Sequence, residues 1–556
     1  MVRLAKVRGA LLWRSFARMA ERPDQVQQQL LQRILRANQE TAFGHQHGFG
    51  NMVTVADYQA AVPVGDYERF RPWIDRMREG ERDVLTVDEP YMFTLTSGTT
   101  GQPKSIPVNS ATRRSTSRLS ALWLYRALRD HPKALDGKAL LVVSPAVEGY
   151  TQGGTPFGSA SGYIYQNAAW AIRRSYALPY AVFSIADYDA KYYAIMRLAL
   201  EHDISLLITP NPSTMMRLVT TADGRHEQII RDIHDGTIDR ELDIAPELRR
   251  ELLRRLKPNP RRAYELEQIV TREGFLDPRG YWPGLTLVGC WKGGSVGVAV
   301  ERLRPWFGDE MPFRDIGYLA SEAQMTLPVQ DKGSAGILAL NTNFYEFIRE
   351  GEMERRDTHV LTAEQLEEGE NYYVLLTTPT GLYRYDINDV VRVAGFYRRT
   401  PMLEFVRKGR DMVSLTGEKL HVGQLIQSMA VAQEHTGIHV AHYRAIGNAE
   451  TSRYEVMLEA MQYPVTDAAL LALGRVIDEQ LGALNIEYDQ KRRSGRLGPP
   501  CIMLMPEGWH ARRLRAKVAR GAGDIQFKDA LLGLPDAEDE VAQPIKQVTV
   551  GVCEVQ

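Results

Sequence analysis

The segment FTLTSGTTGQPKSIPV, residues 93–108, holds a loop of hydroxyl-bearing residues, glycines and one lysine between two apolar runs. The hydroxyl groups can donate hydrogen bonds to an anion, and the glycines allow an anion to approach the backbone closely. The lysine adds a positive charge. This composition predicts a loop that binds phosphate groups, and the alternative is an ordinary polar hairpin rich in turn-forming residues.

The same segment partly matches the Walker A pattern GxxxxGK[ST], in which a helix follows the phosphate loop. Gly98, Lys104 and Ser105 fall at the right positions. Pro103, however, stands where the second glycine belongs and has no N–H group to donate. A convincing helical pattern begins only at Ser110. We therefore expect the loop to join two strands, with a helix starting at Ser110.

The composition is that of a globular protein with more than one domain. The 556 residues are 44% hydrophobic and 25% charged, and this length exceeds what one hydrophobic core usually organises. The formal net charge is −1, so no overall positive field attracts nucleic acid or anionic lipid. We expect two or three domains and no nucleic-acid partner.

Three cysteines, Cys290, Cys501 and Cys553, lie far apart and form no CxxC pair. This spacing argues against a zinc site and a disulfide framework, and it fits a cytoplasmic protein. No apolar run reaches the roughly 20 residues of a membrane span. The basic segment at residues 1–20 predicts an amphipathic helix that either packs on its own domain or serves as a membrane-surface or targeting helix.

Apolar runs of strand length alternate with helical patterns after a helical first 60 residues. The runs are YMFTLT, ALLVVSPA, ISLLITP, LTLVGCW, AGILAL and NYYVLLTT. Such alternation predicts an α/β fold with parallel or mixed sheets. Residues 371–410 form a run of strands, and the pattern after them predicts a small α+β domain. We place the boundary near Gly409, between an N-terminal domain (1–408) and a C-terminal domain (409–556).

Four motifs, in order along the chain, resemble those of a known group of enzymes. TSGTTGQPK (96–104) is similar to the phosphate loop of the adenylate-forming superfamily, which includes acyl-CoA ligases and luciferases. GYLASEAQM (317–325), NFYEFI (343–348) and GLYRYDINDVV (381–391) resemble motifs of the acyl-acid amidosynthetases first known as plant auxin-responsive proteins. The resemblance covers nearly the whole chain. It implies a large adenylate-forming N-terminal domain with mixed sheets and a small α+β C-terminal domain on a hinge.

The resemblance also implies which residues of the N-terminal domain bind ATP and Mg²⁺. The phosphates would be held by Ser97, Gly98, Thr99, Thr100, Gly101 and Lys104. Glu322 would bind Mg²⁺, which favours a carboxylate together with phosphate oxygens, and Tyr318 and Ser321 would lie beside the nucleotide. Asp389 would accept hydrogen bonds from the ribose hydroxyls.

The GLYRYDINDVV motif departs from the family at one position. We expect Asp386 and Asp389 to lie on a turn between an aromatic and an aliphatic strand. Asn388 stands where family members usually have glycine. Asparagine tolerates positive φ better than most residues, so we expect the turn to be kept.

FVRKGRDMVSLTGEKL (405–420) resembles the hinge between the two domains. Arg407 is implied to reach the nucleotide, with Arg410 as its rival, and Asp411 to act as the pivot. Lys419 corresponds to a lysine near the active site of the amidosynthetases. Lys528 is the candidate for the lysine that bridges the carboxylate and the α-phosphate during adenylation.

These features predict an ATP-dependent ligase that uses Mg²⁺. It would convert a carboxylic acid to an acyl adenylate, release pyrophosphate and transfer the acyl group to an amine, expected to be an amino acid. Two alternatives stay open. One is an acyl-CoA ligase, which shares the adenylation step but uses a thiol acceptor, and the other is a nucleotide-binding module without catalysis.

Overall fold

The computed structural model describes residues 2–96, 104–353, 359–409, 411–519, 531–536, 539 and 542–551. These residues form two compact units. The first comprises the residues up to Leu95 and those from Lys104 to Val406, and the second contains the described residues from Arg407 onward. The boundary near Gly409, as a division between functional domains, stays a prediction.

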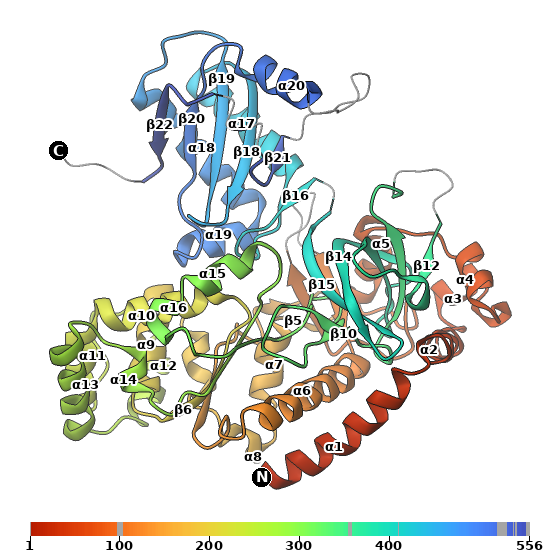
Figure 1. Cartoon of the computed structure of the whole chain (residues 1–556), viewed down its shortest axis with the longest axis horizontal. Coiled ribbons are helices and arrows are strands. Elements are labelled where there is room, and N and C mark those ends of the chain that lie inside the picture. Colours follow the sequence, from red (N-terminus) through yellow and green to blue (C-terminus); the bar gives the residue numbers. More distant parts are fainter. Residues whose placement is uncertain are drawn as a thin grey trace. The chain divides into compact units, whose positions relative to one another are not determined.

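The first part of the chain is helical, as its apolar spacing predicts. Its elements are α1 (Val2–Met19), α2 (Pro23–Ala37), α3 (Ala42–His47), η1 (Phe49–Asn51), α4 (Val55–Ala61) and α5 (Tyr67–Arg78). α1 packs along α6 (Ser110–Asp130), where Phe16 shares a core with Leu119 and Trp123 (Figure 1). The prediction that the basic helix packs on its own domain is therefore confirmed.

The predicted phosphate loop lies between two strands. β1 (Met92–Thr96) precedes it and β2 (Lys104–Val108) follows it. Two short strands complete this sheet in the order β2-β1-β5-β4: β4 (Gly149–Tyr150) and β5 (Pro156–Gly158). α6 begins after Asn109, whose side-chain oxygen accepts a hydrogen bond from the Ala111 N–H at 3.0 Å. Both predictions, a loop between strands and a helix from residue 110, are confirmed.

A second sheet is wholly parallel. Its order is β3-β6-β7-β8, with β3 (Lys138–Leu141), β6 (Ile204–Ile208), β7 (Leu287–Cys290) and β8 (Phe313–Asp315). Its strands are short, mostly buried apolar runs, as expected where helices cover both faces. The segments between and around these strands form α7 (Ala160–Gln166), α8 (Trp170–Arg173), η2 (Tyr180–Ser184), α9 (Tyr188–Ala199), α10 (Pro212–Gly224), α11 (His226–Asp235), α12 (Pro246–Leu253), α13 (Pro260–Glu273), α14 (Pro278–Tyr281), η3 (Gly294–Gly297), α15 (Val298–Glu301) and α16 (Arg304–Phe307). The predicted α/β architecture is confirmed.

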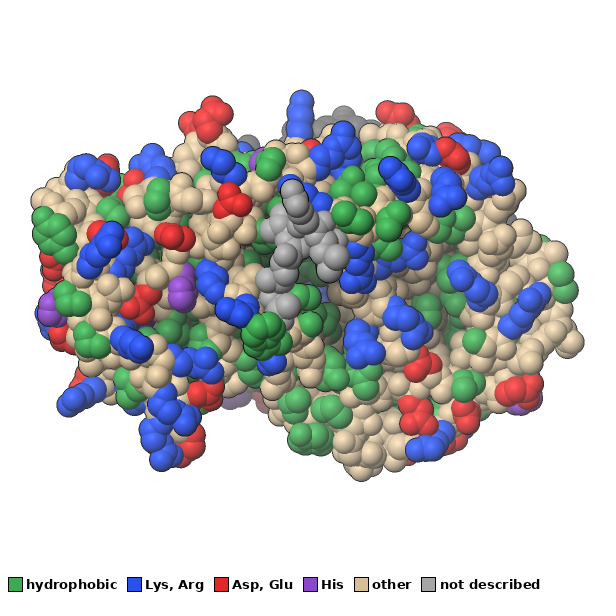
Figure 2. Space-filling view, turned by 90° about the horizontal axis from the view of Figure 1, so that it is seen from below, with side chains coloured by type: hydrophobic (Ala, Val, Ile, Leu, Met, Phe, Trp, Pro, Cys, Tyr) green, Lys and Arg blue, Asp and Glu red, His purple; other side chains and the backbone are tan. Residues whose placement is uncertain are grey.

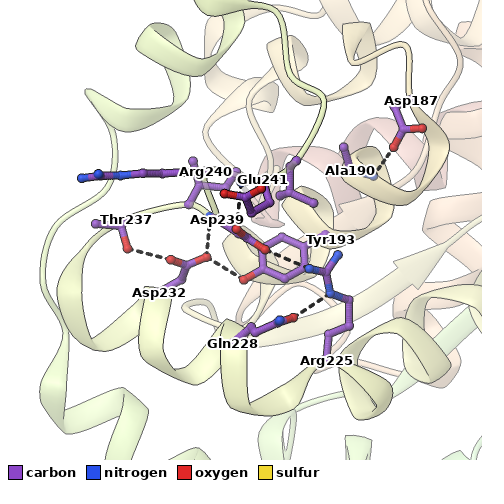
Figure 3. A network of polar contacts seen from close by, with 12 residues as sticks. Asp187, Ala190, Tyr193, Arg225, Gln228, Asp232, Thr237, Asp239, Arg240 and Glu241 are labelled. Carbon is purple, nitrogen blue, oxygen red and sulfur yellow. Dashed lines mark hydrogen bonds and ion pairs between the residues drawn. The ribbon is translucent and has the colours of Figure 1, made fainter.

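A polar network holds the helices of this region together (Figure 3). Asp232 on α11 accepts hydrogen bonds from the hydroxyl groups of Tyr193 and Thr237, each at 2.6 Å. Its carboxylate also accepts one from the Asp239 N–H at 2.7 Å. Arg225 donates to the Asp239 carboxylate at 2.9 Å and lies over the Tyr193 ring, 4.6 Å from its centroid. The network fixes the segment after α11 to α9, which is a structural role.

The third sheet of the first unit has the order β12-β11-β13-β14-β15-β10-β9. Its elements, with one helical turn, are β9 (Thr326–Leu327), β10 (Gly336–Leu338), β11 (Phe344–Arg349), β12 (Leu361–Thr362), η4 (Ala363–Gln365), β13 (Asn371–Thr377), β14 (Tyr385–Tyr397) and β15 (Thr400–Lys408). β13 pairs antiparallel with both β11 and β14. The predicted run of strands at 371–410 is therefore confirmed.

The second unit combines a two-stranded and a five-stranded sheet with helices. Its strands are β16 (Met412–Val413), β17 (Leu420–His421), β18 (Val440–Asn448), β19 (Arg453–Ala460), β20 (Cys501–Leu504), β21 (Leu532–Gly533) and β22 (Lys546–Thr549). The larger sheet has the order β21-β18-β19-β20-β22. The helices are α17 (Val422–Thr436), α18 (Asp467–Leu484), α19 (Ile486–Arg493) and α20 (Trp509–Ala519). This composition confirms the predicted small α+β part.

Cys290 and Cys501 are buried free thiols, and burial raises the pKa of both. Cys553 lies outside the described residues.

Among the helices that the structure describes, none has the length and apolar character needed to cross a bilayer. On the face drawn in Figure 2, Lys and Arg side chains are interspersed with acidic ones rather than gathered in one basic patch.

Candidate active site

Lys104 and Tyr67 form one edge of the candidate site. Lys104 is the first residue of β2, and its ammonium nitrogen lies 5.6 Å from the centroid of the Tyr67 ring. The Tyr67 hydroxyl accepts a hydrogen bond from the Ser105 N–H at 2.7 Å. Tyr67 thus supports Lys104 through its ring and through the next residue's backbone. The other residues assigned to the phosphates lie outside the described residues: Ser97, Gly98, Thr99, Thr100 and Gly101.

Asn388 and Asp389 lie in a bulge within β14, Asp386 is the paired residue just before it, and the prediction of a turn between two strands is wrong. The register between β13 and β14 shifts between Tyr373 and Leu375, so three residues of β14 lie opposite one of β13. The strand continues because β13 pairs with it on both sides of the bulge. Asn388 has φ 56°, as expected at a position suited to glycine, and its N–H donates to the Asp386 carboxylate at 2.8 Å.

Two tyrosine–carboxylate pairs connect the predicted motifs. The Tyr318 hydroxyl donates to Asp389 Oδ2 at 2.6 Å, and the Tyr385 hydroxyl donates to Glu322 Oε1 at 3.1 Å. Burial raises the pKa of both tyrosines, and the negative charge of each partner raises it further. Both hydroxyls therefore stay protonated and act as donors that orient the two carboxylates.

The segment that begins α5 joins these pairs to Lys104. The Gly65 carbonyl accepts a hydrogen bond from the Asp386 N–H at 2.8 Å, just before the bulge. Phe70 packs edge-on against Tyr385, with 5.9 Å between ring centroids. Sequence reasoning missed Gly65, Tyr67 and Phe70, because no motif marks them and their partners lie far along the chain. The structure thus links Lys104 to this segment directly, Glu322 through Tyr385, and the strand that carries Asp389 through Asp386.

A buried ion pair joins two of the recognised motifs. Arg384, in GLYRYDINDVV, donates from Nε to both carboxylate oxygens of Glu346, in NFYEFI, at 3.1 Å. The guanidinium group also donates to the Gln59 and Val62 carbonyls, each at 2.8 Å. Burial raises the pKa of Glu346, and Arg384 opposes that shift. The pair anchors the start of β14 just before the bulge.

The backbone between β8 and Tyr318 is held by hydrogen bonds at the carboxyl end of the parallel sheet. Asp315 accepts hydrogen bonds from the Gly317 and Lys292 N–H groups, each at 2.6 Å. The Trp123 and Trp291 indoles donate to the carbonyls of Asp315 at 2.8 Å and Gly317 at 3.2 Å. Burial raises the pKa of Asp315 to about 6, although these N–H groups oppose the shift. Ligands of open α/β sheets commonly bind at this edge.

The residues present fit a magnesium ion that arrives with a nucleotide. Such an ion needs one or two protein carboxylates, because phosphate oxygens and water supply the other ligands. Glu322 offers one partly exposed carboxylate. Ser321 precedes it in a tight turn closed by the hydrogen bond from the Ala320 N–H to the Ala323 carbonyl at 2.9 Å. Across the described ranges, no three or more His, Cys, Asp or Glu residues form a metal-binding group.

The predicted hinge residues belong to the second unit. Arg407 donates to the Lys408 carbonyl at 2.9 Å. Asp411 has φ 57°, a left-handed conformation that aspartate tolerates. Arg410 and Lys528 lie outside the described residues. The roles of these four residues stay predictions.

Lys419 lies at the end of the turn region 414–419, which joins β16 and β17. The neighbouring Glu418 is buried and accepts hydrogen bonds from Thr416, at 2.8 Å from its N–H and 2.9 Å from its hydroxyl. The Tyr454 hydroxyl donates to the same carboxylate. The Lys419 ammonium nitrogen is 3.8 Å from Glu487 Oε1 on α19. The turn is therefore held rigidly beside α19.

The fold is that of a solved acyl acid amido synthetase, with a larger N-terminal and a smaller C-terminal part. It matches the solved structure of "AtGH3.15 acyl acid amido synthetase in complex with 2,4-DB" with a TM-score of 0.66 and 18% identity, covering 98% of both chains. Models of three domains match in order: the GH3 family N-terminal domain at residues 12–313, the central domain at 336–408 and the C-terminal domain at 423–532. The chain belongs to the GH3 family.

Relatives match along most of the chain. The indole-3-acetic acid-amido synthetase GH3.8 of Oryza sativa subsp. indica is 26% identical over 551 residues, covering 92% of this chain and 88% of the relative. The jasmonoyl–L-amino acid synthetase JAR6 of Nicotiana attenuata is 24% identical over 530 residues, covering 90% of each chain. The resemblance stated from the motifs is thus confirmed at the level of the family.

Proposed function

We propose that this chain activates a carboxylic acid with ATP, releases pyrophosphate and transfers the acyl group from the adenylate to an amine, which we expect to be an amino acid. The observation that supports the proposal is that Lys104, the Tyr385–Glu322 pair and the strand that carries Asp389 are all linked to the segment that begins α5. Relatives named as amido synthetases of indole-3-acetic acid and as jasmonoyl–L-amino acid synthetases support the same chemistry.

Adenylation brings a carboxylate against the α-phosphate, and these two anions repel each other. The site must therefore supply positive charge and oriented donors. Lys104 would offset phosphate charge, Glu322 would hold Mg²⁺ and Asp389 would accept hydrogen bonds from the ribose. When bound, Mg²⁺ would neutralise phosphate charge and polarise a phosphoryl oxygen. Ser97, Gly98, Thr99, Thr100 and Gly101 are proposed as further phosphate-binding residues, and Tyr318 and Ser321 as neighbours of the nucleotide.

The second unit is proposed to contribute in two steps. Lys528 would act on the carboxylate and α-phosphate during adenylation, with Arg407 near the nucleotide. The unit would then turn about Asp411 and bring Lys419 to the acyl adenylate for transfer to the amine.

Carboxylate-dependent ATP–pyrophosphate exchange tests the first half-reaction. The acids to be screened include indole-3-acetate, jasmonate and other aryl and fatty carboxylates, and we expect exchange with at least one acid in the panel. Asp389→Ala and Lys528→Ala should reduce exchange by at least tenfold, whereas Glu368→Gln, at an exposed acid, should not. ATP binding without exchange for any acid would instead favour the nucleotide-binding module.

Acceptor identity is tested separately, by mass spectrometry of products formed from the active acid with pooled amino acids or with coenzyme A. An acyl amide is the expected product. A thioester formed in place of an amide would overturn the amine acceptor and favour the acyl-CoA ligase.

A further inference from the structure

The packing of α1 on its own domain leaves the outer side of this helix uncovered. One face of α1 lies against α6, where Phe16 is buried. On the opposite side, Val7 and Leu11 are 62% and 61% exposed. Arg14 and Arg18 are exposed as well. These four residues are spaced by four, three and four positions, so they follow one another along a single side of the helix. We call them the α1 outer stripe.

The α1 outer stripe lies in a segment with an excess of positive charge. α1 contains five basic residues and no acidic residue. From Lys6 onward, where the structure describes the side chains of the helix, none of its basic side chains takes part in a hydrogen bond or an ion pair. The first acidic residue after the helix, Glu21, is paired with Arg398. The excess is local, because the chain as a whole has a formal net charge of −1.

The turn between β14 and β15 lies beside this helix. The Arg399 N–H donates to the carbonyl of Ala20, directly after α1, at 3.1 Å. The Tyr397 ring packs against Trp13, with 5.7 Å between ring centroids. Phe396 is 40% exposed, and the Arg399 side chain is exposed. The region around the carboxyl-terminal half of α1 therefore includes a further exposed apolar group and a further exposed cation.

This combination of exposed side chains defines the kind of partner that fits. Val7 and Leu11 gain free energy where a partner removes them from water. The guanidinium groups of Arg14 and Arg18 gain from phosphate oxygens, which each group can bind with two hydrogen bonds. A bilayer with anionic lipids offers both contacts, because its headgroups carry phosphates directly above the acyl chains. Nucleic acid offers the phosphates but no apolar layer beneath them.

We propose that the α1 outer stripe is a peripheral membrane-binding surface, which rests on a bilayer that contains anionic lipids. Arg14 and Arg18 contact headgroup phosphates, and Val7 and Leu11 insert at the boundary with the acyl chains. The opposite face of α1 stays packed on α6, so the chain binds in its folded form. Few side chains are involved, so binding is reversible and depends on salt. The inference does not depend on the proposed function, because none of these residues belongs to the candidate active site.

Vesicle flotation with the full chain tests this proposal. The two probes are vesicles of phosphatidylcholine alone and vesicles of equal parts phosphatidylcholine and phosphatidylglycerol. We expect the chain to float with the anionic vesicles, and at least about tenfold less of it to float with the neutral ones. Raising the ionic strength from about 0.1 M to about 1 M should release it, because the Debye length falls from about 10 Å to about 3 Å. No flotation with anionic vesicles, or equal flotation with both, would overturn the proposal.

Two double variants test the two kinds of contact. Arg14→Glu with Arg18→Glu should reduce flotation with anionic vesicles at least about tenfold, because it reverses two charges at the lipid surface. Val7→Ser with Leu11→Ser should reduce it several-fold, because it removes the apolar groups that insert. Unchanged flotation in either variant would overturn the proposed contacts.

A matched control changes the net charge by the same amount elsewhere in the first unit. Arg231→Glu with Arg254→Glu replaces two exposed arginines, one in α11 and one directly after α12, and should float like the parent. If this control loses as much flotation as Arg14→Glu with Arg18→Glu, binding follows net charge instead of the α1 outer stripe, and the proposal is wrong.

Folding and self-association are checked in the same chains. Glutamate in the last turn of a helix is disfavoured by the helix dipole, so Arg14→Gln with Arg18→Gln serves as a second variant. It should melt at the parent temperature and still lose flotation. Sedimentation equilibrium without lipid tests the other occupant of the stripe, a second copy of the chain. A dimer that Val7→Ser with Leu11→Ser dissociates would assign the stripe to that contact and overturn membrane binding.

Discussion

Tyr67 contributes to the candidate site with two different parts of its side chain. The ring lies beneath the Lys104 ammonium group, and the hydroxyl accepts the Ser105 N–H at 2.7 Å. A cation over an aromatic ring is stabilised by the ring's electron density, whereas the hydroxyl satisfies a buried backbone donor. The two contributions can be separated by substitution.

Tyr67→Phe keeps the ring but leaves the Ser105 N–H without this acceptor. The cost of about 1–3 kcal/mol for an unsatisfied buried donor should appear as lower stability and a few-fold higher KM for ATP in pyrophosphate exchange. Tyr67→Leu also removes the ring, so the loss in kcat/KM should be larger. Tyr264→Phe, at a tyrosine that is 61% exposed, is the control. Equal activity in all three variants would contradict the role of Tyr67 in positioning Lys104.

Glu322→Gln keeps an oxygen that can accept the Tyr385 hydroxyl but removes the negative charge. If Glu322 holds Mg²⁺, half-maximal exchange should require at least a severalfold higher Mg²⁺ concentration, with little change in melting temperature. Magnesium titration of pyrophosphate exchange measures this shift. If Glu322→Gln needs the same Mg²⁺ concentration as the parent and the control Glu368→Gln, Glu322 does not bind the metal.

At the scale of elements, the bulge in β14 is the feature that aims Asp389 at Tyr318. It requires positive φ at Asn388, since the extra residues must leave the sheet without ending the strand. The Asp386 carboxylate stabilises this conformation by accepting the Asn388 N–H. Asparagine here adopts a positive φ, the conformation that glycine adopts without strain.

Substitutions at Asn388 test the bulge. Asn388→Gly should be nearly neutral for stability and activity, because glycine adopts positive φ without strain. Asn388→Val should cost about 1–2 kcal/mol of stability and weaken ATP binding, because a β-branched residue is disfavoured there. Thermal unfolding and the KM for ATP check both expectations. A fully active, equally stable Asn388→Val variant would show that the bulge is not needed.

The same elements show which parts of the fold and of the candidate site could be predicted from the sequence. Strands such as β6 and helices such as α18 were predictable because their apolar periodicity is local. The bulge was not, because its register depends on β13, and the polar DIND segment alone resembles a turn. The site residues Tyr318, Glu322 and Asp389 came from motif resemblance. Tyr67 could not be found, because its contact with Ser105 spans 38 positions and leaves no local pattern.

On the scale of the whole molecule, the two units have separate hydrophobic cores. The second unit also contains a buried charged network. Arg444 and Arg513 each bind both Asp536 and Asp539, at distances of 2.7–3.0 Å. Through Arg513, these contacts tie α20 to β18 and to the residues after β21.

Arg513→Leu should destabilise the second unit selectively. Removing Arg513 leaves Arg444 as the one remaining cation of this network for two carboxylates, at a cost of up to about 3–5 kcal/mol. Calorimetry should show a lower transition for the second unit and an unchanged one for the first. Arg512→Leu, at the partly exposed neighbour, is the control. A variant that unfolds like the parent would show that the network contributes little.

The burial of Cys290 and Cys501 has a practical consequence for measuring motion between the two units. Maleimide dyes react with accessible thiolates, and both of these thiols are inaccessible and have raised pKa values. Once Cys553 is replaced by serine, two cysteines introduced at exposed positions, one in each unit, should take up nearly all the dye. Single-molecule energy transfer between the dyes could then follow the separation of the units through each step of turnover.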